Sequence, residues 1–238
     1  MKFKLTTETK VFLGRTLYRI EALIDFGMVK AGEKGGFVEA DKNLSQDGNA
    51  WVSGNARVSG DAWVSGNALV SGDAQVSGNA RVSGDALVYG NALVYGNAQV
   101  SGDAQVYGDA LVYGNARVSG NARVYGDALV YGNALVYGNA RVYGDALVYG
   151  NALVYGNARV SGNARVSPIN IIGLDYNVTI SDAHMMIGCE HHQISDWQSF
   201  DDRRIIQMDG ARAAKFWKTH GPYLLALCAD RPGIGDAK

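Results

Sequence analysis

The chain has 238 residues and a formal net charge of −1 at pH 7, so it is long enough for one large domain or two small ones. This balance excludes bulk electrostatic binding to nucleic acid or to an anionic membrane. The two cysteines, Cys189 and Cys228, are too few for a disulfide framework. No apolar run reaches transmembrane or signal-peptide length, which predicts a cytoplasmic protein with reduced thiols.

Residues 1–48 precede the regular part of the sequence, and we predict that they form a small N-terminal cap. Alternating apolar residues predict short strands at Lys2–Thr6 and Thr16–Ala22. Trp51 and Trp63 follow at positions that should face outward from the next strands. We expect both rings to pack under the cap rather than to bind a ligand.

Residues 49–167 are a six-residue repeat. From Asn49 to Gly162 the chain is nineteen uninterrupted copies of (Asn/Asp)-Ala-x-Val-(Ser/Tyr)-Gly, and a twentieth copy ends in Pro168. Glycine at every sixth position disfavours a helix, and disorder would not preserve valine without error. Ala-x-Val-(Ser/Tyr) reads as a strand with Ala and Val on one side, and Gly-(Asn/Asp) as a corner with positive φ. Three such units close a triangular coil of eighteen residues, so the repeat predicts a parallel β-helix with Ala and Val inside.

The pattern Val-(Ser/Tyr)-Gly-(Asn/Asp)-Ala-x resembles the hexapeptide repeat of the left-handed β-helix superfamily. The resemblance implies an all-β, left-handed, triangular β-helix of about six to seven coils in a homo-oligomer, typically a trimer, and many members are acyltransferases. The flanking segments resemble a narrower group, the uncharacterised hexapeptide-repeat proteins of bacteriophages and prophages, which implies the cytoplasm of a bacterial host. These segments are Leu17-Tyr18-Arg19-Ile20, Gly35-Gly36-Phe37-Val38, Asn43-Leu44-Ser45 and Ile187-Gly188-Cys189. No activity is established for that group, so this resemblance implies none for the chain.

Positions eighteen apart should stack on one outer face, and one face then carries leucine and tyrosine on four consecutive coils. Its members are Leu93, Tyr95, Leu111, Tyr113, Leu129, Tyr131, Leu147 and Tyr149. Water would penalise such an apolar plane if it were bare. Three explanations stay open. The plane is an interface between copies of the chain, or it is a dock for the chain's own C-terminal helices, or it arose by sequence drift at repeat positions that tolerate different residues.

A second face alternates aromatic rings with guanidinium groups. Tyr89, Tyr107, Tyr125 and Tyr143 lie beside Leu87, Gln105, Arg123, Arg141 and Arg159. The candidate ligand-binding set is Tyr125, Tyr143, Arg123, Arg141 and Arg159, which suits a small anionic or nucleotide-like ligand. The alternative is a solvated face on which Arg lies over Tyr. The third face begins polar and turns apolar at Leu135, Tyr137, Leu153 and Tyr155.

The corners also carry charge. Asp109, Asp127 and Asp145 should stack on three successive coils, where their carboxylates repel one another. A cation or a basic partner would relieve this repulsion, and a solvated corner is the alternative.

After Pro168 the regular pattern ends. Residues 168–195 predict an irregular final coil with strands at 178–180 and 185–187, and residues 196–238 predict helices and a loose tail. Ser199 or Asp201 can cap one helix and Asp209 a second, and Gly221-Pro222 should divide that stretch from a last helix. An apolar stripe at helical spacing, which should be buried, comprises Phe216, His220, Tyr223, Leu224 and Leu227.

Cys189-Glu-His191-His192 is the only cluster in the sequence whose residue types suggest a metal site or a catalytic site. A strand would place Cys189 and His191 on one side, and His184 or Cys228 would have to complete a zinc site. A Cys–His nucleophile pair and a plain polar strand end are the alternatives. We predict no metal and no cofactor.

These observations predict a non-catalytic, oligomeric binding or scaffold protein. The phage resemblance implies an accessory role, in which the protein binds a host component such as a defence protein or sequesters a small anionic ligand. The alternative is a hexapeptide-repeat acyltransferase with His191 or His192 as the general base. Such enzymes resemble one another in an inserted loop and a histidine among the coils, and residues 49–167 contain neither.

Overall fold

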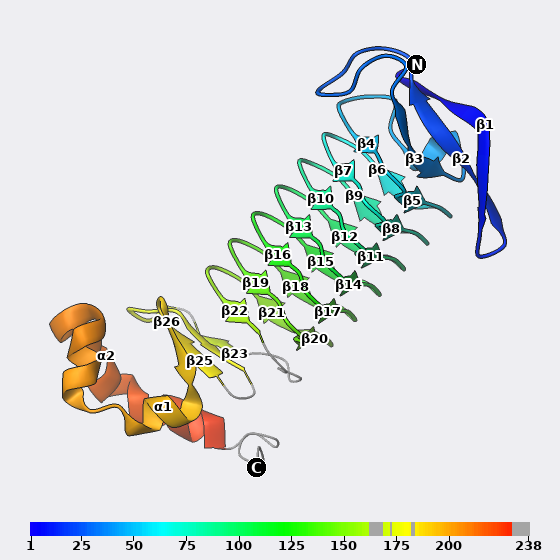
Figure 1. The fold of residues 1–238 in the computed structure, drawn as a ribbon. Helices are drawn as coiled ribbons and strands as arrows, with labels where there is room; N and C mark the ends of the chain where they lie inside the picture. Colours follow the sequence, from blue (N-terminus) through cyan, green and yellow to red (C-terminus); the bar gives the residue numbers. More distant parts are fainter. Residues whose placement is uncertain (162–168, 172, 182–183, 230–238) are drawn as a thin grey trace.

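The computed structural model describes residues 1–161, 169–171, 173–181 and 184–229. The last copy of the repeat, residues 163–168, and the predicted tail from residue 231 lie outside the described residues. The chain forms a parallel β-solenoid with a β-rich cap at its N-terminal end and a mixed unit of strands and helices at its C-terminal end (Figure 1).

Each of the nineteen copies from Asn49 onward contributes one short strand to one of three sheets. The regular strand covers only x and Val, because the flanking residues already turn toward the corners. A nine-stranded sheet contains β1 (Phe3–Phe12), β2 (Arg15–Ala22), β3 (Lys34–Val38), β5 (Arg57–Val58), β8 (Gln75–Val76), β11 (Leu93–Val94), β14 (Leu111–Val112), β17 (Leu129–Val130) and β20 (Leu147–Val148). A seven-stranded sheet contains β4 (Trp51–Val52), β7 (Leu69–Val70), β10 (Leu87–Val88), β13 (Gln105–Val106), β16 (Arg123–Val124), β19 (Arg141–Val142) and β22 (Arg159–Val160). A six-stranded sheet contains β6 (Trp63–Val64), β9 (Arg81–Val82), β12 (Gln99–Val100), β15 (Arg117–Val118), β18 (Leu135–Val136) and β21 (Leu153–Val154).

The register confirms a coil of three hexads. Leu93 pairs in parallel with Leu111, and Leu111 with Leu129. Backbone bonds run from each coil to the next, as from the Leu111 amide to the Ala128 carbonyl at 2.9 Å. The inward Ala and Val side chains of the coils are almost fully buried and form one continuous core. The predicted parallel β-helix is therefore confirmed.

The glycine corners leave no room for a side chain. Gly120 has a φ of +65°, and a Cβ added there would lie 3.0 Å from the Gly138 amide nitrogen of the next coil. Next to the glycines, asparagine amides bond along the corner from coil to coil, as from Asn97 Nδ2 to Asn115 Oδ1 at 3.0 Å. Glycine is thus required by its backbone angle and by the close stacking of coils.

The N-terminal cap extends the solenoid by strand pairing. β1 and β2 form an antiparallel pair, and β3 joins β5 in parallel, so the cap continues the nine-stranded sheet. Trp51 is 2% exposed and contacts Phe26 edge-on at 5.3 Å, which confirms its place under the cap. Trp63 is 43% exposed, so the expectation that it packs under the cap is wrong. The short 3-10 helix η1 (Asp41–Asn43) reaches β6 but leaves Trp63 partly exposed.

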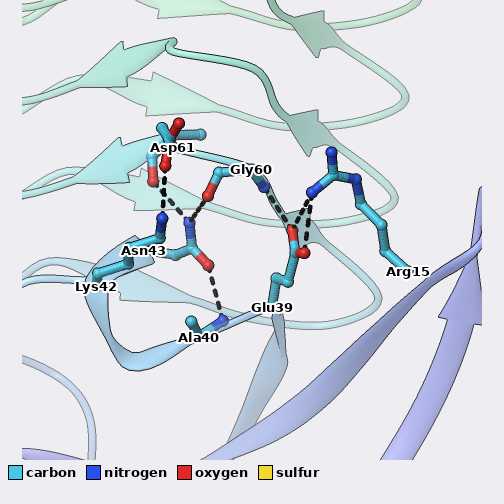
Figure 2. Close-up of polar contacts among 8 residues, drawn as sticks. Arg15, Glu39, Ala40, Lys42, Asn43, Gly60 and Asp61 are labelled. Carbon is cyan, nitrogen blue, oxygen red and sulfur yellow. Dashed lines mark hydrogen bonds and ion pairs between the residues drawn. The ribbon is translucent and has the colours of Figure 1, made fainter.

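Polar side chains of the cap bond the first coil (Figure 2). Asn43 is fully buried and donates to the carbonyls of Gly60 at 3.0 Å and Ala62 at 2.8 Å. Glu39 accepts the Gly60 amide at 2.6 Å and is held by Arg15 at 2.8 Å. The exposed carbonyl and amide groups of the first corner are satisfied in this way.

A buried lysine completes the closure of the same end. The Lys2 ammonium donates to the Ala50 carbonyl at 2.8 Å and lies over the Phe26 ring. Burial lowers the pKa of Lys2 to about 8, and the nearby Asp47 carboxylate opposes this shift.

The C-terminal unit is an antiparallel meander covered by helices. β23 (Ile169–Ile171), β24 (Val178–Ile180), β25 (His184–Ile187) and β26 (Glu190–Gln193) pair in sequence order. One face of this sheet places Met186 in the solenoid core, and the other packs on α1 (Ile194–Ser199) and α2 (Asp202–Ala229). The strands at 178–180 and 185–187 are confirmed, but the expected final coil is wrong. These strands form their own antiparallel sheet, which does not continue the parallel ladders.

The helices follow expectation at one predicted boundary and differ from it at another. Asp201 accepts the Arg204 amide at 2.8 Å and caps α2 as predicted. A break lies at Asp209 and Gly210, whose φ values are −152° and +61°, where the sequence predicts that a second helix begins. The predicted division at Gly221-Pro222 is wrong, because both residues lie within α2, where the absent side chain of Gly221 lets Trp217 pack against the backbone. Of the predicted stripe, Phe216 and Leu224 are buried, whereas Tyr223 is 63% exposed.

Candidate functional surfaces

The leucines and tyrosines predicted to form a plane lie together on the outer side of the nine-stranded sheet. We call the set Leu93, Tyr95, Leu111, Tyr113, Leu129, Tyr131, Leu147 and Tyr149 the Leu–Tyr plane. Its tyrosine rings stack in one column, with centroid spacings of 4.9, 4.9 and 5.4 Å. Each side chain is half-buried by its neighbours in the column, and burial raises the pKa of Tyr95 and Tyr113.

The helices of the chain do not cover this plane. The buried side chains of α1 and α2, among them Trp197, Phe216 and Leu224, pack on Val178, Ile180 and neighbouring residues of the four-stranded sheet. Both helices lie beyond the last coil in Figure 1. The alternative in which the plane is a dock for the C-terminal helices is therefore wrong.

The second face is ordered as the repeat predicts. The rings of Tyr89, Tyr107, Tyr125 and Tyr143 stack at 4.8, 4.9 and 5.1 Å. The side chains at x on β16, β19 and β22 form an exposed basic row of Arg123, Arg141 and Arg159. Burial and the neighbouring tyrosines raise the pKa of Tyr125, and Arg141 and Arg159 oppose that shift.

The five predicted ligand residues share this face but do not surround one cavity. Two of them, Arg141 and Arg159, line a cleft of about 550 Å³ between the last coils and the C-terminal unit. Arg123, Tyr125 and Tyr143 lie outside the lining of that cleft.

The same cleft gathers residues that sequence reasoning did not bring together. From the last coils come Asn139, Tyr155 and Asn157, and from the C-terminal unit come Asp175, Tyr176, Asn177, Cys189 and Arg212. Tyr155 was noted only as an outward ring of the third face. Arg212 and Tyr176 lie in segments without a repeat, so no periodicity could have placed them beside Arg159.

The acidic corner is present but unremarkable. Asn91 donates to Asp109 at 2.9 Å, and Asp127 and Asp145 continue the same corner. Within the described residues, no group of three or more His, Cys, Asp and Glu side chains could hold a metal ion.

The cysteine and histidines of residues 184–192 are spread over several contacts. The His184 and His191 rings stack at 5.1 Å, and His192 bonds Glu190 at 2.8 Å and contacts Trp197 edge-on. Burial, with smaller contributions from His184, Arg159 and His192, lowers the pKa of His191.

The described residues do not assemble the zinc site that the sequence left open as an alternative. Cys189 precedes β26 and is exposed, whereas Cys228 is buried on α2, so the two thiols are in different environments. None of the histidines lines the large cleft or the apolar pocket next to it, so the acyltransferase alternative gains no base there.

The comparison with known families concerns the repeat. A family model described as the YdcK beta solenoid repeat matches residues 50–66, 74–90, 86–102, 104–120, 116–132, 122–138, 128–144, 134–150 and 140–156. The matches cover less than half of the chain, and they support a repetitive β-solenoid. No curated protein matches the chain. Among the described residues, no helix is long and apolar enough to span a membrane.

Proposed function

We propose that the protein is a non-catalytic scaffold or binding protein that assembles with copies of itself through the Leu–Tyr plane. The observation that carries the proposal is the plane itself: four successive coils present leucine and stacked tyrosine on one sheet, and no described helix covers them. A flat, regular apolar surface of this kind is typical of a contact between subunits.

The distribution of side chains supports an interface over drift. On the coils that contribute Leu93 and Leu111 to the plane, the other two sheets carry Gln99 and Gln105, then Arg117 and Arg123. Leucine occupies the outer strand position on four consecutive coils of the nine-stranded sheet, but on only two described coils of each other sheet (Leu69 and Leu87; Leu135 and Leu153). Stacked tyrosines also lose little conformational entropy when a second surface covers them.

Several finer properties belong to the same proposal and rest on resemblance. They are the left-handed winding of the coils, the trimer, and the cytoplasm of a bacterial host as the location. The resemblance of the flanking segments to phage proteins makes a host component, such as a defence protein, the expected partner of the assembled scaffold.

Light scattering of the purified chain tests the assembly. A Leu111→Glu, Leu129→Glu double variant places two carboxylates in the plane of each subunit. The matched control, Leu87→Glu with Gln105→Glu, places two carboxylates at the same repeat positions of the neighbouring seven-stranded sheet.

We expect the wild type and the control to be oligomers and the plane variant to be a folded monomer. Circular dichroism and thermal melting establish that both variants are folded. A monomeric wild type, or dissociation of both variants alike, would refute assembly through the plane.

A further inference from the structure

The geometry points to a second site, and we propose that the cleft between the last coils and the C-terminal unit binds a small organic phosphate that carries a planar ring. Guanidinium groups would hold the phosphate, and Tyr155 would stack on the ring. The proposal rests on other residues than the Leu–Tyr plane and does not depend on assembly.

Charge is the first reason. The cleft is lined by three guanidinium groups, from Arg141, Arg159 and Arg212, against one carboxylate, from Asp175. Within the described part of the chain, none of the three arginines takes part in an ion pair. This excess of positive charge around a concave site favours an anion, and the paired N–H groups of a guanidinium match phosphate oxygens.

The positions of these arginines are fixed by structure. Arg141 and Arg159 stand on adjacent strands, β19 and β22, whose register is set by the ladder. Arg212 donates from Nη2 to the Asp175 carbonyl at 2.9 Å, and its guanidinium lies 4.8 Å from the centre of the Tyr176 ring. The Tyr176 hydroxyl donates in turn to Asp209 at 2.5 Å. The Arg212 side chain is therefore held before a ligand binds, so it loses little entropy on binding.

The ring preference follows from where a tyrosine column ends. Tyr137 and Tyr155 stack at 5.3 Å on the six-stranded sheet, and Tyr155 lines the cleft. A planar ring on the far side of Tyr155 would continue the same column. Side-chain amides of Asn139, Asn157 and Asn177 line the cleft as well and can bond the edge of such a ring.

The size of the cleft agrees with this class of ligand. Its volume of about 550 Å³ is within the range of pockets that bind small molecules. It has room for a mononucleotide-sized molecule, which is larger than a lone phosphate ion.

The repeat itself supplies conservative variants for a test. Glutamine occupies the position of Arg159 in other coils, as at Gln105, and serine occupies the position of Tyr155, as at Ser119. Arg159→Gln and Tyr155→Ser should therefore fold as the wild type does. Arg117→Gln is the matched control, because Arg117 has the same repeat position on an exposed strand away from the cleft.

Isothermal titration of the full chain with AMP and with inorganic phosphate is the measurement. We expect AMP to bind more tightly than phosphate. Arg159→Gln should lower the affinity for AMP at least about tenfold, which is the loss typical of one charged hydrogen bond. Tyr155→Ser should reduce AMP affinity toward that of phosphate, and Arg117→Gln should leave it within about twofold. Absence of AMP binding, or equal losses in Arg159→Gln and Arg117→Gln, would overturn the site. Equal affinities of the wild type for AMP and phosphate would overturn the role of Tyr155.

Discussion

The two ends of the solenoid are closed in different ways. At the N-terminal end β3 pairs with β5, and buried polar side chains bond the first coil. At the C-terminal end the last described strands of the three sheets are β20, β21 and β22, and a separate antiparallel sheet packs Met186 against the core. At the N-terminal end strand pairing joins the cap to the nine-stranded sheet, whereas at the C-terminal end packing of one sheet face leaves a cleft beside it. The N-terminal end is therefore closed by strand pairing and hydrogen bonds. The cleft lies at the C-terminal end, where an antiparallel sheet covers the described coils without pairing with their strands.

The largest expected effect comes from one glycine at each end. Gly48 and Gly156 have similar φ values, +69° and +64°, so alanine strains the backbone at both by about 1–2 kcal/mol. A Cβ at Gly48 would lie 2.5 Å from the Gly66 carbonyl oxygen, whereas at Gly156 the nearest described atom is Asn177 Nδ2 at 3.6 Å. Gly48→Ala should therefore cost about 1–3 kcal/mol more than Gly156→Ala in urea unfolding. Equal losses would show that both ends tolerate a side chain alike and would break the comparison.

A contrast of about the same size is expected for two asparagines. Asn43 at the N-terminal end is buried and holds two carbonyls and the Ala40 amide, whereas Asn177 at the C-terminal end is exposed. Asn43→Ala should lower the free energy of unfolding by about 2–4 kcal/mol, because it leaves buried acceptors unpaired. Asn177→Ala should change it by less than about 0.5 kcal/mol. Thermal melts of both variants give the comparison, and a loss at Asn177 as large as at Asn43 would contradict the polar closure of one end only.

The repeat made the solenoid predictable, and the ends were not. Six-residue spacing sets which side chains point inward and which positions stack, so the core and the Leu–Tyr plane follow from the sequence alone. Trp63 has the same repeat position as its neighbours, and the sequence does not say how far the cap extends over it. The strands after Pro168 were predictable from their apolar residues, but their antiparallel pairing was not, because no periodicity fixes it. The cleft was missed for the same reason, since no periodicity places Arg212 of α2 and Arg159 of β22 in one lining.

Hydroxyl-radical labelling of tyrosines tests the proposed assembly most directly. Tyr113 and Tyr131 lie in the Leu–Tyr plane, and Tyr107 and Tyr125 lie on the neighbouring sheet with the same stacking distance of 4.9 Å. In a single chain the two pairs are half-buried alike, so each pair is the internal control for the other. We predict that Tyr113 and Tyr131 are protected severalfold relative to Tyr107 and Tyr125 in concentrated protein, and that dilution removes the difference. Equal labelling of both pairs at every concentration would contradict assembly through the plane.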